Sequence, residues 1–154
     1  MTSADHNPIL VALDTTDVKR ATELRRKLQG SVGGFKIGKE FFTANGPADV
    51  RHVLGTAPLF LDLKFHDIPN TVAGAMRAAA VLKPLIVNVH ASGGPAMLRA
   101  AKQAAREEAA NLGIAPPLVI AVTVLTSLDD DDLRAVGLDP PVAGQVERLA
   151  KLTA

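Results

Sequence analysis

Short apolar runs alternate with longer segments of helical periodicity along this chain. The apolar runs predict strands over residues 8–13, 32–37, 59–64, 85–89 and 118–124. Apolar spacing, capping residues and glycine stops predict helices over 18–28, 47–54, 71–82, 95–111, 129–136 and 142–152, and a helical turn over 39–44 that breaks at Asn45-Gly46. Nearly continuous apolar strands are buried on both faces, so the pattern indicates a parallel sheet covered by helices.

Polar residues gather at one kind of place in this pattern. Each predicted strand has at least one at or just beyond its carboxyl end: Asp14, Lys36, Asp62 with Lys64, His90 and Thr126. A (β/α) barrel carries its active site at this rim, with residues from several strands. An open doubly wound sheet uses mainly one switch point. The spread over five strands therefore favours the barrel, and neither a dinucleotide-binding G-x-G-x-x-G nor a P-loop motif is present.

The length of the chain conflicts with a closed barrel. Eight strands and typically about 250 residues close a (β/α)8 TIM barrel, whereas this chain has 154 residues and five predicted strands. No linker or low-complexity tract divides it. We therefore expect one partial barrel domain over residues 1–154, an α/β fold of about five βα units that corresponds to the first two-thirds of a barrel.

Composition narrows the class of protein. The chain is 47% hydrophobic and 21% charged, which is typical of a globular domain, and a net charge of +1 gives no argument for nucleic acid or a membrane as partner. It has no cysteine for a disulfide or a thiolate site, and its four histidines lack metal-ligand spacing, so we expect no metal. With no signal-like start and no apolar run near 18 residues, we expect a cytoplasmic protein.

The stretch from Leu59 to Val72 concentrates the charged chemistry. Strand alternation places Phe60, Asp62 and Lys64 on one face, so that opposite charges meet at the strand's carboxyl end. At an effective dielectric near 20, two unit charges about 4 Å apart interact by roughly 4 kcal/mol. Such a pair can act on charge that develops during a reaction, although it could also be an incidental ion pair at a solvated strand end.

The segment from Asp62 to Val72, DLKFHDIPNTV, resembles the signature of the orotidine 5'-phosphate decarboxylase family. Supporting blocks follow in family order along the chain: VALD (11–14), FKIGKEFFTANGP (35–47), VNVHASGG (87–94) and VTVLTS (122–127). The Asp-x-Lys-x-x-Asp core is also similar to related sugar-phosphate decarboxylases and aldolase-like synthases. The resemblance implies a lyase that converts orotidine 5'-monophosphate to uridine 5'-monophosphate in pyrimidine (UMP) synthesis, with no cofactor and no metal, as a homodimer with shared active sites.

The resemblance also implies roles for individual residues. Lys36, Asp62, Lys64 and Asp67 would form a catalytic charged array, with Lys64 as proton donor, Asp62 beside the substrate carboxylate and Asp67 donated by the partner subunit. Substrate contacts are implied for Asp14 and Lys36 at the ribose hydroxyls, Ile68 and Thr71 near the ribose from the partner, Asp62, and Thr126 at the pyrimidine ring.

Each assignment has a plainer alternative. Asp14 could cap the first helix, Lys36 could be a surface lysine, Thr126 could be an ordinary strand-end hydroxyl, and His90 is expected to hold a loop at the barrel mouth. The family's phosphate-gripping glycine-arginine loop is not found in this sequence. We therefore expect little decarboxylase activity from these 154 residues alone, and a non-catalytic half-barrel fragment or a related sugar-phosphate decarboxylase remains an alternative.

Overall fold

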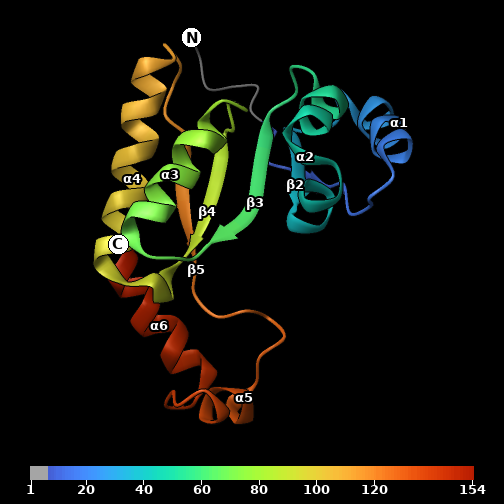
Figure 1. Ribbon diagram of the computed structural model, residues 1–154. Coiled ribbons are helices and arrows are strands. Elements are labelled where there is room, and N and C mark those ends of the chain that lie inside the picture. The colour runs from blue at the N-terminus through green and yellow to red at the C-terminus, as the bar shows by residue number, and fades with distance from the viewer. Residues whose placement is uncertain (1–6) are drawn as a thin grey trace.

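The computed structural model describes residues 7–154 as a run of alternating strands and helices (Figure 1). Residues 1–6, on which the expected absence of a signal sequence partly depends, lie outside the described part. The elements in chain order are β1 (Leu10–Ala12), α1 (Val18–Leu28), β2 (Gly34–Gly38), α2 (Lys39–Leu54), β3 (Leu59–Phe65), α3 (Pro69–Ala80), β4 (Ile86–His90), the 3₁₀ turn η1 (Ala91–Gly93), α4 (Gly94–Asn111), β5 (Leu118–Val122), α5 (Asp130–Ala135) and α6 (Val142–Thr153).

The five strands form one parallel sheet in the order β1-β2-β3-β4-β5, so every strand pairs with its neighbours in sequence. This sequential order with a helix after each strand is the order of a (β/α) barrel. The chain therefore forms an incomplete barrel, and the predicted fold class is confirmed. Strands β1 and β5 are the two ends of the sheet among the described residues.

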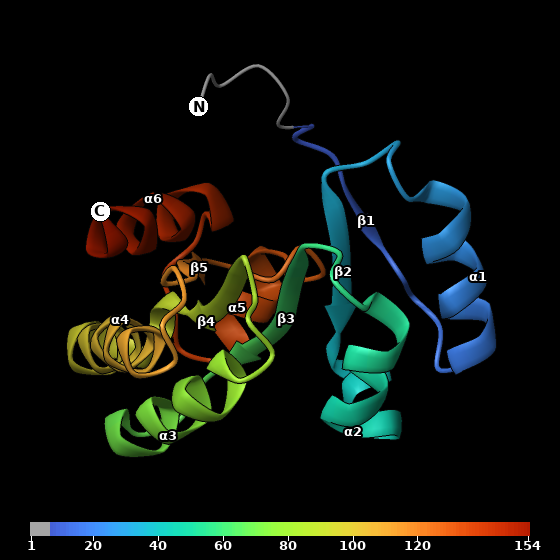
Figure 2. The same ribbon diagram turned by 90° about the horizontal axis from the view of Figure 1, so that it is seen from above.

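Helices cover the outer face of the curved sheet, as the view in Figure 2 shows. One group of buried side chains packs α1 and α2 against β1, β2 and β3, centred on Phe35, Ile37, Phe41 and Leu61. A second group packs α3 and α4 against β4 and β5 through methionine and alanine side chains. Small alanine side chains let these two helices approach each other closely, which explains the alanine-rich sequence that both share.

Local sequence signals account for where the helices begin and bend. The carboxylate of Asp17 accepts hydrogen bonds from the backbone of Lys19 and Arg20, so Asp17 is the N-cap of α1. The predicted break near residue 46 is a kink inside α2, where Gly46 has a φ of 74°. That conformation favours glycine because it has no Cβ. The amide of Asn45 donates to the carbonyl of Thr16 and so ties the kink to the loop after β1.

Most predicted element boundaries lie within two residues of the observed ones, but three strands are shorter than predicted. β1 covers only Leu10–Ala12, β2 begins at Gly34 and β5 ends at Val122. Sheet pairing limits them: the register of β1 and β2 joins only Leu10–Ala12 to residues 34–36. Apolar character alone predicted the longer runs, although a strand extends only as far as its neighbour offers a partner.

The chain beyond β5 is arranged differently from the rest. A loop leads from β5 to α5, which lies beyond the carboxyl ends of the strands, and α6 returns to contact α4 and η1 (Figure 1). Asp129 caps α5 reciprocally with Asp132, as expected for acidic residues at a helix N-terminus. None of the helices in the described range 7–154 is long and apolar enough to cross a membrane.

Candidate active site

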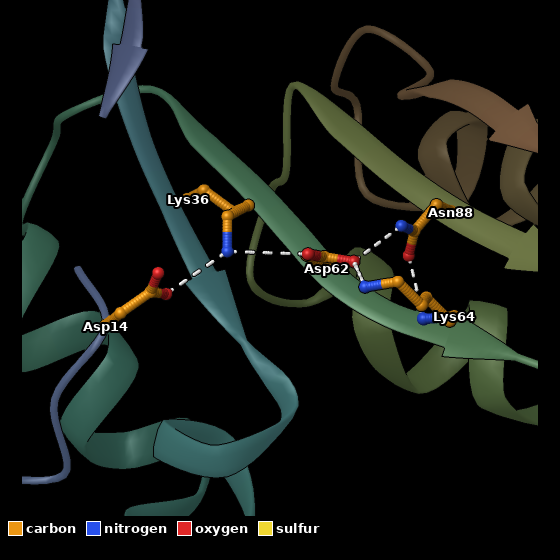
Figure 3. Close-up of polar contacts among 5 residues, drawn as sticks. All are labelled: Asp14, Lys36, Asp62, Lys64 and Asn88. Atoms are coloured by element: carbon orange, nitrogen blue, oxygen red, sulfur yellow. Dashed lines mark hydrogen bonds and ion pairs between the residues drawn. The ribbon is translucent and has the colours of Figure 1, made fainter. Parts of the chain in front are cut away.

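Four charged side chains of alternating sign form a row across the carboxyl ends of β1, β2 and β3 (Figure 3). The ammonium of Lys36 lies between two carboxylates, 3.3 Å from Asp14 Oδ1 and 3.4 Å from Asp62 Oδ2. The ammonium of Lys64 lies 2.5 Å from the other oxygen of Asp62. Two acids and two amines thus meet in a formally neutral row within a single chain.

Strand register brings these residues together. β2 pairs with β3 so that Lys36 lies opposite Phe60 and Gly38 opposite Asp62. The row continues to Asp14 because the backbone N–H of Leu13 donates to the carbonyl of Lys36 at 3.0 Å, which holds the end of β1 against β2. The side chain of Asp62 is only 12% exposed, whereas Asp14 at the outer end of the row is 73% exposed.

Strand β3 is irregular where it carries the lysine. Leu61 pairs with Val87 and Phe65 with Val89, so four steps along β3 correspond to two along β4. Within this bulge Lys64 has a φ of 52°, in the left-handed region that non-glycine residues rarely adopt. The simple strand alternation that predicted a shared face for Asp62 and Lys64 therefore does not describe the backbone here, although the two side chains do meet.

Asn88, on β4, is a member of the site that the sequence reasoning missed. Its amide nitrogen donates to Asp62 Oδ1 at 2.6 Å, and its amide oxygen accepts from the backbone N–H of Lys64 at 2.7 Å (Figure 3). The residue is 2% exposed. A signal was available, because Asn88 is a polar residue between the apolar Val87 and Val89 in the middle of a strand, and buried amides need partners.

Opposing effects act on the Asp62 carboxyl. Burial by itself would raise its pKa, but hydrogen bonds from Lys64 and Asn88, together with the charges of Lys64 and Lys36, outweigh that effect. The pKa is therefore held below its ordinary value of 3.8. Asp62 stays ionised at neutral pH, so the row keeps its alternating charges.

The structure separates the remaining predicted site residues from this row. Asp67 and Ile68 lie in the exposed turn after β3, where the Asp67 carboxylate accepts from the N–H of Ile68 at 2.6 Å. Thr71 is exposed in the first turn of α3, and Thr126 is exposed in the turn after β5. Their proposed roles depend on a partner subunit or a bound substrate, which the structure does not contain.

Two plainer alternatives from the sequence are wrong. Asp14 is not the cap of the first helix, since Asp17 has that position. Lys36 is not a free surface lysine, because its side chain is 24% exposed and bonded to two carboxylates. The row therefore includes both residues as integral members.

A hollow of about 540 Å³ lies beside the row, where β3 and β4 end against α2. His66 and His90 lie on one wall with ring centroids 5.3 Å apart. Burial first, and then the neighbouring His66, Lys39 and Lys64, lower the pKa of His90 below 6.5, so its ring is neutral at pH 7. Among residues 7–154, no cluster of three or more histidine or acidic side chains could hold a metal ion.

Comparison with known proteins decides the family. The model of the "Orotidine 5'-phosphate decarboxylase / HUMPS family" matches residues 7–154. The chain belongs to this family. A protein named orotidine 5'-phosphate decarboxylase from Paramagnetospirillum magneticum is 59% identical over 95% of this chain, and one from Rhodospirillum rubrum is 58% identical over 99%. The crystal structure of orotidine 5'-phosphate decarboxylase from Lactobacillus acidophilus superimposes with a TM-score of 0.87 at 36% identity, covering 96% of this chain and 66% of that one.

The family match extends over nearly the whole chain but not over the whole of its relatives. The chain spans 63% of the length of each of the two curated relatives. The charged row falls inside the shared part, because the match begins at residue 7 and Asp14 is its first member. Family membership is thus established for the segment that carries the row.

Proposed function

We propose that this chain supplies one subunit's share of a site that decarboxylates orotidine 5'-monophosphate to uridine 5'-monophosphate, a step of pyrimidine nucleotide synthesis. The observation that carries the proposal is the alternating row Asp14–Lys36–Asp62–Lys64 in a member of this family. The relatives named for this activity at 58–59% identity support the choice of substrate.

The row suits a reaction that leaves an electron pair on carbon. When the bond between the ring carbon and the carboxylate breaks, carbon dioxide departs and the electron pair stays on the ring. Fixed ammonium groups stabilise that charge because they need no reorganisation at the moment of reaction. The Lys64 ammonium then transfers a proton to the ring carbon, which forms the new C–H bond and leaves a neutral amine to be reprotonated by water.

The carboxylates of Asp14 and Asp62 would favour the charged form of the two lysines and hold their ammonium groups in position. Asp62, held ionised between the two ammonium groups, would lie beside the substrate carboxylate, and their repulsion would fall as carbon dioxide leaves. Asp14 and Lys36 would hold the ribose hydroxyls at the exposed end of the row. No metal or resident cofactor enters this scheme, which uses only side chains of the protein.

A second copy of the chain completes the proposed site. Asp67, Ile68 and Thr71 are exposed on the turn and helix after β3, and Ile68 is 66% exposed, which supports their availability to a partner. In a homodimer each copy would add its Asp67 to the other's row and its Ile68 and Thr71 to the ribose pocket. Thr126 would contact the pyrimidine ring from the turn after β5.

The test is release of labelled carbon dioxide from carboxyl-labelled orotidine 5'-monophosphate, with enzyme in excess over substrate. We expect slow release by this chain, because it spans only part of the relatives, and loss of that release in Lys64→Ala. Lys27→Ala, which changes an exposed lysine on α1, is the matched control and should leave release unchanged. Joining residues 7–154 to the part of the P. magneticum relative that has no counterpart here should raise the rate greatly.

The outcomes separate the alternatives. If neither this chain nor the fusion releases more carbon dioxide than its Lys64→Ala form, the proposed activity is wrong. An inactive chain with an active fusion would identify these residues as a non-catalytic half-barrel when alone. Turnover of a pentulose or hexulose phosphate in preference to the nucleotide would assign the chain to the sugar-phosphate branch of its family.

A further inference from the structure

We propose that Asn88 is a positioning residue of the charged row, which fixes both the carboxylate of Asp62 and the left-handed backbone of Lys64 with a single side-chain amide. The inference deepens the proposed function, since it concerns how that same site is assembled. It rests on the contacts of Asn88 and does not depend on turnover.

The hydrogen bonds of Asn88 join the two β3 residues that carry the reaction in the proposed scheme. The amide nitrogen donates to Asp62 Oδ1, the same oxygen that the Lys64 ammonium contacts, and the amide oxygen accepts from the Lys64 backbone. The Asn88 amide therefore positions the Lys64 backbone directly and the Lys64 ammonium through Asp62. At 2% exposure Asn88 has little access to water, so each of these bonds lacks a ready substitute.

The bulge explains why a side chain is needed at this place. Regular pairing of β3 with β4 stops after Leu61 and resumes at Phe65, and the Lys64 N–H donates to Asn88 Oδ1 within that gap. A positive φ at a lysine is unfavourable and persists only where the surroundings hold it. The hydrogen bond from the Lys64 N–H to the Asn88 amide oxygen stabilises this backbone conformation. In that conformation the Lys64 ammonium contacts Asp62, two residues earlier on the same strand.

The Asn88 amide serves both bonds at once because it carries its donor and its acceptor on separate atoms. A carboxylate could accept from the Lys64 N–H but could not donate to Asp62, and alanine could do neither. This difference lets two substitutions separate the two tasks. Asn88→Ala removes both bonds, whereas Asn88→Asp keeps the size of the side chain and the acceptor but places a second carboxylate beside Asp62.

The first measurement is the pKa of Asp62 in the full chain. The NMR chemical shift of its carboxyl carbon, recorded as a function of pH, reports the titration. The charged groups around Asp62 are Lys64 and Lys36, with Asp14 beyond Lys36, and they are the same in every variant. We expect the pKa of Asp62 to rise in Asn88→Ala and to rise further in Asn88→Asp, where two adjacent carboxylates compete for ionisation. Val87→Ala is the control, because Val87 is buried on the same strand but packs in the cluster beneath α3 and α4. It should leave the pKa of Asp62 unchanged.

The second measurement is hydrogen exchange of the Lys64 amide. Loss of an N–H···O bond worth about 1.4 kcal/mol corresponds to about tenfold faster exchange. We expect that acceleration in Asn88→Ala but not in Asn88→Asp, which retains the acceptor.

Equal Asp62 titrations in Asn88→Ala and Val87→Ala would overturn the proposal, as would unchanged exchange of the Lys64 amide in Asn88→Ala. If both Asn88 variants unfold while Val87→Ala stays folded, the role of Asn88 is structural and the proposal is again wrong. Should the expected shifts occur in a chain that neither binds uridine 5'-monophosphate nor releases carbon dioxide, the positioning role stands and only the proposed function fails.

Discussion

Strands β3 and β5 belong to the same parallel sheet, yet they differ in how far they bury their apolar and charged side chains. β3 lies between β2 and β4 and buries Leu59, Leu61 and Leu63 while it carries two of the four charges of the row. β5 lies at the end of the sheet beside β4, and its Leu118 and Ile120 are 59% and 36% exposed. The comparison shows that a charge can be buried on a strand when one neighbouring strand supplies an opposite charge and the other supplies an amide, as Lys36 and Asn88 do for Asp62.

The same difference divides the candidate site. The side-chain contacts of the row are made by residues of β2, β3 and β4 and by Asp14 in the loop after β1, so they all come from neighbouring elements of the sheet. Thr126, beyond β5, is exposed and outside the row. The charged row forms through the pairing of adjacent strands within one chain. The environment of Thr126, which follows the end strand β5, depends instead on what packs against that end of the sheet.

The largest expected contrast comes from one substitution made in both strands. Leu61→Ala should destabilise the chain by about 2–5 kcal/mol, because Leu61 is fully buried and its loss leaves a cavity. Leu118→Ala should change the free energy of unfolding by less than about 0.5 kcal/mol, since most of that side chain already contacts water. Urea unfolding followed by circular dichroism measures both.

The comparison would break if Leu118→Ala cost as much as Leu61→Ala. That result would mean that β5 is covered in solution, by a second copy of the chain or by another partner. Repeating the Leu118→Ala measurement over a range of protein concentrations would then distinguish self-association from an effect within one chain.

A smaller contrast is expected between ion pairs in the two regions. Asp62→Asn leaves Lys36 and Lys64 facing each other across a neutral group, and we expect a loss of about 1–3 kcal/mol, below the cost of breaking a fully buried pair because both ammonium groups are partly exposed. Asp131→Asn removes the partner of Arg134 on α5, where the carboxylate is 90% exposed. A surface pair of this kind should cost less than about 0.5 kcal/mol.

Equal losses in Asp62→Asn and Asp131→Asn would show that the row is no better shielded than the surface. Unfolding in added salt gives a second reading of the same contrast. The Asp131 pair should weaken as salt screens it, whereas the Asp62 row should respond less.

Sequence alone predicted the sheet, the helices and the three strand residues of the row, because each depends on local periodicity and on strand-end position. Lys36 and Asp62 meet through the register of the adjacent strands β2 and β3, and Asp14 reaches Lys36 from the loop after β1. Asn88 was missed because its importance comes from the bulge opposite, and strand alternation cannot predict a bulge or a positive φ at Lys64. The roles of Asp67, Ile68, Thr71 and Thr126 remain predictions from family resemblance, since they concern groups outside a single chain.

The smallest expected effect is the pH dependence of the Asp62 contribution, which sharpens the comparison by isolating one carboxyl. The pKa of Asp62 is lower in the folded chain than its ordinary value of 3.8, so the unfolded chain binds the proton first as pH falls. The stabilisation from ionised Asp62 is therefore fully present above about pH 4 and is lost as pH falls through the lowered folded pKa. The difference in unfolding free energy between wild type and Asp62→Asn should be constant near neutrality and should shrink only in that acidic window.

His90 provides the internal check on this assignment. Its pKa is also lowered, from 6.5, so it too makes the folded chain less stable as pH falls, but in a window that begins near pH 6.5. That effect is common to wild type and Asp62→Asn, and it cancels in their difference. A difference that already shrank between pH 7 and 5 would therefore contradict an Asp62 held ionised by Lys64, Asn88 and Lys36, and would place the titrating group elsewhere in the row.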